Sequence, residues 1–130
     1  MHRVLLAEDN KLNQVVAAGT LQKLGYTVEI VDGGIDAVEA CKRSDFDAVL
    51  MDVMMPDMDG YEATAKVRAH EASLGDRHVP IIGLSARAMD GDREIALSAG
   101  MDDYLTKPLR EDLLKEVLVR WIGAPLGVAR

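Results

Sequence analysis

The sequence predicts an α/β fold in which a five-stranded parallel sheet is covered by helices on both faces. The first observation is that short apolar runs and longer segments of helical periodicity alternate five times along the chain. The second is that the run at 48–51 is apolar throughout, as expected for a strand buried on both faces of a parallel sheet. Because right-handed crossovers leave few topologies, the flavodoxin-like strand order 2-1-3-4-5 is favoured.

Each predicted strand is a short run dominated by aliphatic residues. The five runs lie at 3–7, 27–31, 48–51, 80–84 and 103–106. Pro80 is tolerated at the first position of its strand because that residue need not donate a hydrogen bond there. We find no internal repeat, no low-complexity segment and no sign of a second domain.

The segments between and after the strands predict five helices. They lie at 11–24, 33–43, 59–72, 91–99 and 110–122. Asn10 and Asp32 are expected to cap the first two helices with their side-chain oxygens, and Asp59 begins the third. The last helix has six apolar residues at the spacing of a core-facing stripe: Leu113, Leu114, Val117, Leu118, Trp121 and Ile122.

The length and composition of the chain fit one domain. It has 130 residues, of which 48% are apolar and 28% charged, enough to bury a sizeable core. The domain is expected to span 1–123, with 124–130 as a tail or the start of a linker, because Gly123 and Pro125 end the last helix. Cys41 is the single cysteine, so an internal disulfide and a multi-cysteine metal site are excluded.

Charge and hydropathy exclude several classes of partner. The net charge of −7 argues against a nucleic-acid-binding surface on this domain, and it fits a cation site as well as ordinary solubility. No run approaches the roughly 18 apolar residues of a transmembrane helix. The first strand begins after two residues, so no signal peptide is expected. The expected location is the cytoplasm, free or as the cytoplasmic module of a membrane-anchored protein, with no membrane contact by this domain.

Polar side chains follow four of the predicted strands. Glu8 and Asp9 follow the first strand, Asp52 the third, Ser85 the fourth and Lys107 the fifth. The carboxyl ends of parallel strands meet at one edge of a sheet, which is where ligands bind in open α/β folds. Three clustered carboxylates repel one another unless a cation lies among them. Their hard oxygens favour Mg²⁺, which also binds phosphate oxygens.

The same residues suit the binding of a phosphoryl group. With a cation at the carboxylates, the Lys107 ammonium and the Ser85 hydroxyl are left to face the other ligand of the metal. A cation, an ammonium and a hydroxyl donor around one carboxylate is an arrangement that holds phosphoryl groups. Asp52 is then either a ligand of the metal or the acceptor of the group.

Four motifs, spread in order over about 3–122, resemble those of a known family. They are LAEDN at 6–10, LMDVMMPDMDG at 50–60, LSA at 84–86 and YLTKP at 104–108. Together they resemble the receiver domains of two-component response regulators. Three segments are most similar in sequence to receivers carried by hybrid sensor histidine kinases: EDNKLNQ at 8–14, MDGDRE at 89–94 and AGMDDY at 99–104.

By that resemblance Asp52 is the phosphoacceptor. It would take a phosphoryl group from a phosphohistidine on a histidine kinase or a histidine phosphotransfer domain. Asp9, Asp52 and the backbone carbonyl of Met54 would hold magnesium, and Glu8 would reach the ion directly or through water.

The resemblance also assigns roles to the later motifs. Lys107 would pair with phosphoryl oxygens, and the Ser85 hydroxyl would hydrogen-bond to one of them. Tyr104 matches the switch aromatic that turns inward when the hydroxyl residue moves toward the phosphate, and the Lys107–Pro108 bond is expected to be cis. The family implies a phosphorylation-dependent switch whose fourth helix, fifth strand and fifth helix contact a downstream or intramolecular output partner. The resemblance also implies that the domain is not an enzyme, beyond assisting its own phosphorylation and dephosphorylation.

Two positions depart from the commonest family pattern. Arg87 and Met54 lie two residues after Ser85 and Asp52, and we expect their side chains to modulate the lifetime of the phosphate. Three other functions compete with the switch. A magnesium-dependent phosphatase needs an acid/base Asp where Met54 stands, and a flavodoxin-like cofactor binder needs a phosphate-binding loop where Glu8 stands. The third is a constitutive interaction module.

Overall fold

The computed structural model describes residues 2–75, 77–86 and 91–123. Five parallel strands form one sheet in the order β2-β1-β3-β4-β5, which confirms the predicted topology. The strands are β1 (Arg3–Ala7), β2 (Thr27–Val31), β3 (Ala48–Asp52), β4 (Ile81–Ser85) and β5 (Asp103–Thr106). From β1 the chain continues to β2 on one side of the sheet, and from β3 it continues to β4 on the other, so the crevice between the carboxyl ends of β1 and β3 is the switch point of the topology.

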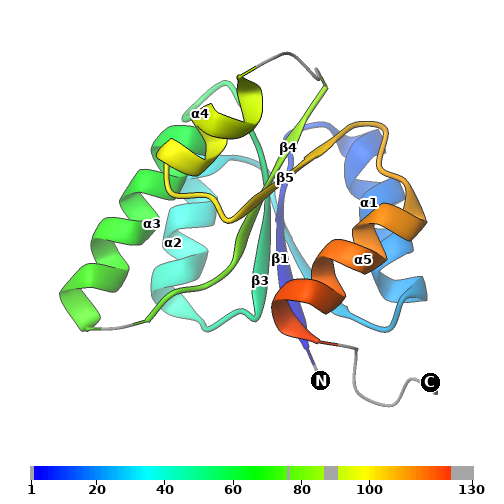
Figure 1. Cartoon of the computed structure of the whole chain (residues 1–130), viewed down its shortest axis with the longest axis horizontal. Coiled ribbons are helices and arrows are strands. Elements are labelled where there is room, and N and C mark those ends of the chain that lie inside the picture. Colours follow the sequence, from blue (N-terminus) through cyan, green and yellow to red (C-terminus); the bar gives the residue numbers. More distant parts are fainter. Residues whose placement is uncertain (1, 76, 87–90, 124–130) are drawn as a thin grey trace.

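Five helices cover the two faces of this sheet. They are α1 (Lys11–Lys23), α2 (Gly34–Arg43), α3 (Gly60–Leu74), α4 (Asp92–Ser98) and α5 (Glu111–Ile122). Figure 1 shows α1 and α5 on one face and α2, α3 and α4 on the other. No helix in the described part of the chain is long and apolar enough to cross a bilayer.

Each face of the sheet has its own hydrophobic core. One core packs Leu5, Val49 and Met51 against α2 and α3. The other packs Leu6 and Leu50 against α1 and α5. Because successive residues point to opposite faces and both faces are covered, 4–7 of β1 and 48–51 of β3 are apolar without interruption, as the sequence predicted.

Of the two predicted N-caps, Asn10 is confirmed and Asp32 is wrong, and Asp59, predicted only to begin the third helix, is the N-cap of α3. The side chain of Asn10 accepts a hydrogen bond from the N–H of Asn13 at 3.0 Å, and that of Asp59 accepts one from Glu62 at 2.8 Å. Asp32, however, does not cap α2. Gly33 occupies the N-cap position without a side chain, and the Asp32 carboxylate instead accepts hydrogen bonds from the side chains of α1.

The boundaries differ from the predictions by a few residues. Strand β4 begins at Ile81, so Pro80 precedes it, and helix α3 continues to Leu74. The buried stripe of α5 is narrower than its apolar pattern, because the side chains of Leu113 and Trp121 are 41% and 38% exposed. Met51 is fully buried as predicted.

Candidate functional site

The carboxyl ends of the strands bring the predicted site residues to one edge of the sheet. Asp52 is the last residue of β3, and Glu8 directly follows β1. Their neighbours Met51 and Ala7 are paired in register, so the two carboxylates leave adjacent strands at the same level. Both are buried, with exposed fractions of 3% for Asp52 and 2% for Glu8.

Lys107 bridges these two carboxylates. Its ammonium lies 2.7 Å from Glu8 Oε1 and 2.9 Å from Asp52 Oδ2. The backbone N–H of Lys107 donates to the carbonyl of Ser85 at 2.6 Å, which holds the residue against the end of β4. The Lys107–Pro108 peptide bond is cis, as the resemblance implied. One ammonium therefore serves two buried acids that are distant in the sequence.

A third carboxylate, that of Asp9, completes an acidic cluster. Oxygens of Glu8, Asp9 and Asp52 lie within 4.8 Å of one another, and this is the only such group among the described residues. Asp9 is exposed while the other two are buried, so the cluster opens to water on one side. Hard oxygen donors beside a solvent-accessible position fit Mg²⁺, which retains several water ligands in proteins.

The charges of the cluster perturb one another. Burial raises the pKa of Asp52 to about 6, and the neighbouring Glu8 carboxylate adds to this rise, although Lys107 opposes it. Burial would also raise the pKa of Glu8, but hydrogen bonds from Lys107 and from the Asn10 N–H bring it below its usual value. The two carboxylates raise the pKa of Lys107 against the effect of its burial. The cluster is thus short of positive charge at Asp52.

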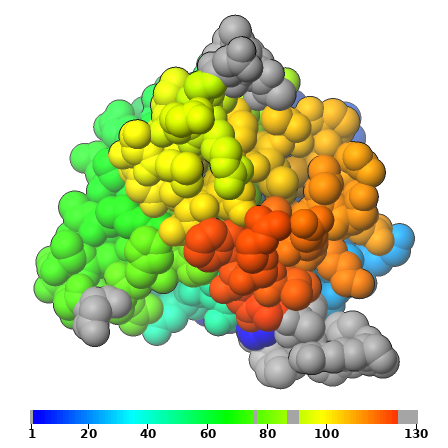
Figure 2. Space-filling view, in the orientation of Figure 1, coloured from blue at the N-terminus to red at the C-terminus, as the bar shows by residue number. Residues whose placement is uncertain are grey.

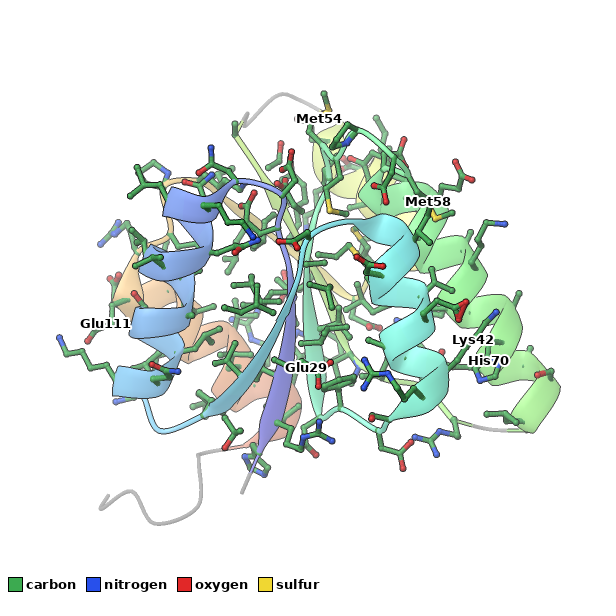
Figure 3. All side chains as sticks on the ribbon, turned by 180° about the vertical axis from the view of Figure 1, so that it is seen from behind. Glu29, Lys42, Met54, Met58, His70 and Glu111 are labelled. Carbon is green, nitrogen blue, oxygen red and sulfur yellow. The ribbon has the colours of Figure 1, made fainter. Side chains whose placement is uncertain are left out.

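Met54 lies in the loop between β3 and α3, with a side chain that is 69% exposed. Figure 3 shows Met54 at the end of the molecule where the strands terminate. Its backbone N–H donates to Asp52 Oδ1 at 3.3 Å. Gly60 closes this loop against β3, because a Cβ at that position would collide with the carbonyl oxygen of Asp52.

Ser85 and Tyr104 lie on the two strands beyond β3. Ser85 is 6% exposed and ends β4, one residue beyond the partner of Asp52 in the ladder. Tyr104 of β5 pairs with Gly83 of β4, and its hydroxyl donates to Asp92 Oδ2 of α4 at 3.4 Å. The hydroxyl residue and the aromatic residue are therefore on neighbouring strands. Arg87 lies outside the described residues.

Sequence reasoning missed two side chains that fix the loops around the site. The amide of Gln14 donates to the Glu8 carbonyl and to Asp32 Oδ1, both at 2.6 Å. Asp57 accepts backbone hydrogen bonds from the start of α2. An interior helical Gln and a loop Asp have no local signal for such roles, because their partners lie on other elements.

A buried acid also organises the face formed by α4, β5 and α5. Asp103 accepts hydrogen bonds from Arg93 of α4 at 3.0 Å and from Trp121 of α5 at 3.0 Å. Arg120 of α5 donates to the same carboxylate at 3.2 Å, and the N–H of Tyr104 at 2.9 Å. The pKa of Asp103 is lowered, because these donors outweigh the effect of its burial. The residue that precedes the candidate switch tyrosine thus ties two helices together.

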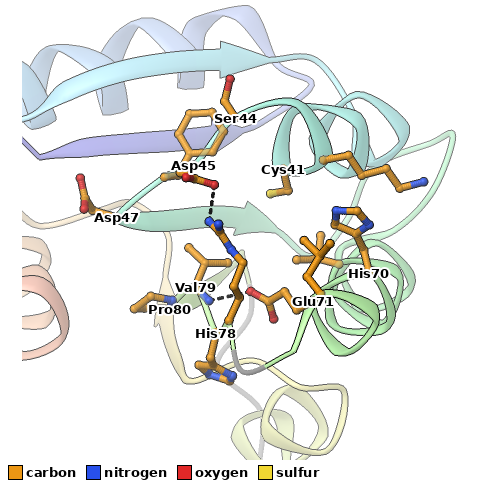
Figure 4. Close-up of a pocket in the computed structure, with 14 residues that line it drawn as sticks. Cys41, Ser44, Asp45, Asp47, His70, Glu71, His78, Val79 and Pro80 are labelled. Carbon is orange, nitrogen blue, oxygen red and sulfur yellow. Dashed lines mark hydrogen bonds and ion pairs between the residues drawn. The ribbon is translucent and has the colours of Figure 1, made fainter.

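A pocket of about 350 Å³ lies at the opposite, amino-terminal end of the strands. Figure 4 shows its lining, which includes Cys41, His70 and Glu71 and an ion pair between Arg77 and Asp45. Burial raises the pKa of the Cys41 thiol to about 11, as expected for a core cysteine and not for a reactive one. None of the predicted site residues lines this pocket.

The chain is similar to known signalling proteins over most of its length. It is 44% identical over 124 residues to the sensor protein GacS of Pseudomonas syringae pv. syringae, and 40% identical over 118 residues to the histidine kinase BarA of Shigella flexneri. These matches cover 95% and 91% of the chain but only 14% and 12% of the relatives, so the chain spans a small part of each.

Solved receiver domains are similar in both structure and sequence. The receiver domain of sensor histidine kinase PA1611 from Pseudomonas aeruginosa PAO1, with a magnesium ion in its active site cleft, is 49% identical with a TM-score of 0.84. That match covers 95% of this chain and 98% of the other. The receiver of Ssk1, in complex with the Saccharomyces cerevisiae phosphotransfer protein Ypd1, is 30% identical with a TM-score of 0.86, covering 93% and 88%.

A match to the response regulator receiver domain, as a family, extends over residues 4–119. The match includes both strand ends that supply the acidic cluster and the strand that supplies Lys107. The hybrid sensor kinases among the relatives agree with the narrower resemblance of the motifs. The chain belongs to the response regulator receiver domains of two-component phosphorelay signalling.

Proposed function

We propose that this domain is a phosphorylation-dependent switch in which Asp52 accepts a phosphoryl group from a phosphohistidine. The observation that carries the proposal is the Lys107 ammonium, held 2.7 Å from Glu8 and 2.9 Å from Asp52 beside the acidic cluster. An ammonium next to a nucleophilic carboxylate is placed to neutralise the charge of an incoming phosphoryl group. The donor is a histidine kinase or a histidine phosphotransfer domain.

The transfer needs one bond to form and one to break. A carboxylate oxygen of Asp52 attacks the phosphorus, the phosphorus–nitrogen bond of the phosphohistidine breaks, and its electron pair returns to the imidazole. Lys107 pairs with phosphoryl oxygens and the Ser85 hydroxyl donates to one of them. With a pKa of about 6, Asp52 is mostly ionised near neutral pH and is able to act as the nucleophile.

Magnesium is the proposed cofactor. Asp9, Asp52 and the Met54 carbonyl would hold it, and Glu8 would contact it directly or through water. When bound, the ion would supply positive charge to the carboxylates and to the phosphoryl oxygens. The magnesium ion in the cleft of the PA1611 receiver and the acidic cluster of this chain support this assignment.

Ser85 and Tyr104 are the proposed switch residues. Movement of the Ser85 hydroxyl toward the phosphate would let the Tyr104 ring turn inward, which would break its 3.4 Å contact with Asp92 at the start of α4. Figure 2 shows α4, β5 and α5 together on one face of the molecule. We assign this face to a downstream or intramolecular output partner, whose affinity changes as the two-state equilibrium shifts.

Docking of the phosphoryl donor is assigned to the start of α1. Leu12, Val15 and Val16 are 72%, 70% and 56% exposed, and they lie within two turns of the acidic cluster. An exposed apolar patch beside the site suits contact with another protein. The complex of the related Ssk1 receiver with the phosphotransfer protein Ypd1 supports this class of partner.

The receiver family is a signalling module, not a catalytic family in itself. We propose that 1–123 form the receiver and that 124–130 are a tail or linker within a cytoplasmic hybrid kinase or relay protein. Binding to nucleic acid or to a membrane is not assigned to this domain. Met54 and Arg87 are proposed to modulate the lifetime of the phosphate from positions beside the path of attacking water.

The test is the intact mass of the protein after incubation with acetyl phosphate, with and without magnesium. A magnesium-dependent gain of one phosphoryl group in the parent, absent in Asp52→Asn, is the expected result. A gain that persists in Asp52→Asn would place the acceptor elsewhere. No gain from either acetyl phosphate or a phosphorylated phosphotransfer domain would favour a constitutive interaction module. Continuous release of inorganic phosphate would favour a phosphatase-like enzyme.

A further inference from the structure

We propose that Asp57 is a positioning residue for the magnesium site: it binds the start of α2 and thereby fixes the loop that carries Met54. This inference rests on the proposed function of the acidic cluster. Asp57 lies in the segment between β3 and α3, three residues after Met54. It is not among the residues that we assign as ligands of the metal.

The contacts of Asp57 are those of a helix cap supplied by a different element. Its Oδ1 accepts the N–H of Gly34 at 3.2 Å, and its Oδ2 accepts the N–H of Ile35 at 3.4 Å. The residue at the N-cap position of α2, Gly33, has no side chain to do this. A carboxylate at the positive end of a helix is also favoured by the helix dipole. Burial acts to raise the pKa of Asp57, but the N–H of Met58, at 2.7 Å from Oδ1, and those of Gly34 and Ile35 lower it.

Two glycines make room for this contact. A Cβ on Gly33 would lie 2.6 Å from Asp57 Oδ2, and a Cβ on Gly34 would collide with the carbonyl oxygen of Met58. Gly33 has an extended backbone with φ −167° and ψ 178°, which any residue can adopt. The glycine at 33 is therefore explained by the space that Asp57 occupies and not by an unusual backbone conformation.

Elsewhere the loop is fastened mainly at its ends. The N–H of Val53 donates to the Leu84 carbonyl at 2.8 Å, and the N–H of Gly60 donates to the Val53 carbonyl at 2.9 Å. Between Met54 and Asp59, Asp57 makes the only hydrogen bonds within the described part of the chain that reach an element other than β3 and α3. The Met55 side chain, 6% exposed, adds packing against the core.

The start of α2 is also connected to the other side of the metal site. Asp32 directly precedes Gly33, and Gln14 joins Asp32 Oδ1 to the Glu8 carbonyl through hydrogen bonds of 2.6 Å. Gln14 thus links the backbone of Glu8 to the residue before α2, and Asp57 links the loop of Met54 to the first turn of α2. Both segments of the metal site are held at the same helix terminus. Such supporting contacts orient metal ligands, and their removal typically weakens metal binding by about tenfold or more.

The test is a magnesium titration of the full chain, in which NMR monitors the backbone amide resonances of Asp52 and Met54. Asp57→Ala is expected to raise the dissociation constant for magnesium about tenfold. Gly33→Ala, whose Cβ would displace the Asp57 carboxylate, is expected to raise the dissociation constant by a similar factor. The double variant should bind magnesium no more weakly than either single variant. Asp57→Asn should restore part of the affinity, since the Asn oxygen can still accept the N–H of Gly34 whereas its amide nitrogen cannot accept that of Ile35.

A matched variant separates positioning from general destabilisation. Val38→Ala removes buried packing from α2 but leaves the contacts of Asp57 in place. It should lower the thermal stability about as much as Asp57→Ala without changing the affinity for magnesium. Equal affinity in Asp57→Ala and the parent, or equal weakening in Val38→Ala, would overturn the inference. A parent that binds no magnesium would instead overturn the proposed function.

Discussion

Asp52 and Asp103 have the same exposed fraction of 3% but opposite surroundings. Asp103 accepts hydrogen bonds from two arginines, one indole and one backbone N–H, and its pKa is lowered. Asp52 shares one ammonium with Glu8 and accepts one long backbone hydrogen bond, and its pKa is raised to about 6. Burial opposes the ionisation of both carboxylates, and the two sites differ in the donors that the fold supplies in return.

The comparison separates a structural acid, Asp103, from the acid that we propose as the phosphoacceptor, Asp52. Around Asp103 two arginines face the buried carboxylate, one of them also paired with Glu116, and the donors come from three elements that the contact holds together. Around Asp52 three carboxylates face one ammonium. A site of this kind is less stable than it could be, and a bound cation would relieve the imbalance of charge.

The largest effect is expected where the single ammonium of the Asp52 site is removed. Lys107→Ala should slow phosphorylation by acetyl phosphate by about 10²–10³-fold, the usual loss for one charge-stabilising donor. Lys115→Ala removes an exposed lysine of α5 and should leave the rate unchanged. The initial rate of mass gain in saturating magnesium measures both variants. An unchanged rate in folded Lys107→Ala would show that the ammonium takes no part in the transfer.

Removing the charge of Asp103 should instead affect the free energy of unfolding. Asp103→Asn is expected to lose about 2 kcal/mol near neutral pH, because two charged and two neutral donors lose their acceptor charge. The lowered pKa of Asp103 means that its contribution is present above the unfolded-state pKa and is lost as the pH falls through the folded-state value. The gap between variant and parent should therefore narrow below about pH 4.

Urea denaturation at several pH values measures this gap. Asp112→Asn is the matched control, since this acid of α5 is 64% exposed and its ion pair with Arg110 contributes little. A gap that stays constant with pH would mean that the charge of Asp103 is not what stabilises the α4–β5–α5 face.

The smallest effect has the opposite sign. Asp52→Asn should stabilise the magnesium-free domain by about 1 kcal/mol near neutral pH, because the ionised carboxylate is disfavoured by burial and by Glu8. Because the pKa of Asp52 is raised in the folded state, the parent is fully stable only below the unfolded-state pKa and loses stability as the pH rises through the folded-state pKa. The advantage of the variant should thus appear between about pH 4 and pH 6.

Thermal unfolding in the presence of a chelator measures this advantage. Added magnesium should stabilise the parent more than Asp52→Asn and so reduce or reverse the difference. A variant that is less stable than the parent at every pH would contradict the view that Asp52 is an unrelieved buried acid.

The sequence predicted the strand order and the clustered strand ends because both follow from short-range pattern and topology. Once the apolar run before Asp52 is a strand of a parallel sheet, its carboxyl end must lie beside that of the strand before Glu8. Lys107 enters the same edge through β5 for the same reason. The strand order alone was therefore enough to predict that these residues meet, without any detail of loop conformation.

The errors and omissions have a common physical cause. Asp32 is a good N-cap by local preference, but Asp57, 23 residues from Gly34, takes the N–H groups at the start of α2. Gln14 reaches an acceptor 18 residues away. Trp121 continues the apolar spacing of α5, yet its N–H requires the polar edge at Asp103 and leaves the ring partly exposed. Each depends on how loops and helix ends meet, which periodicity does not encode.

The bridge made by Lys107 also constrains when this protein can first work during its synthesis. The ammonium reaches across 99 residues to Glu8 and 55 to Asp52, and it arrives on the last strand of the sheet. Chains emerge from the ribosome amino terminus first, so the acids are made long before the lysine. Under the proposed function, a nascent chain would have its acceptor carboxylate before it has the lysine that pairs with phosphoryl oxygens, and competence for phosphorylation would begin only when the final strand has joined the sheet.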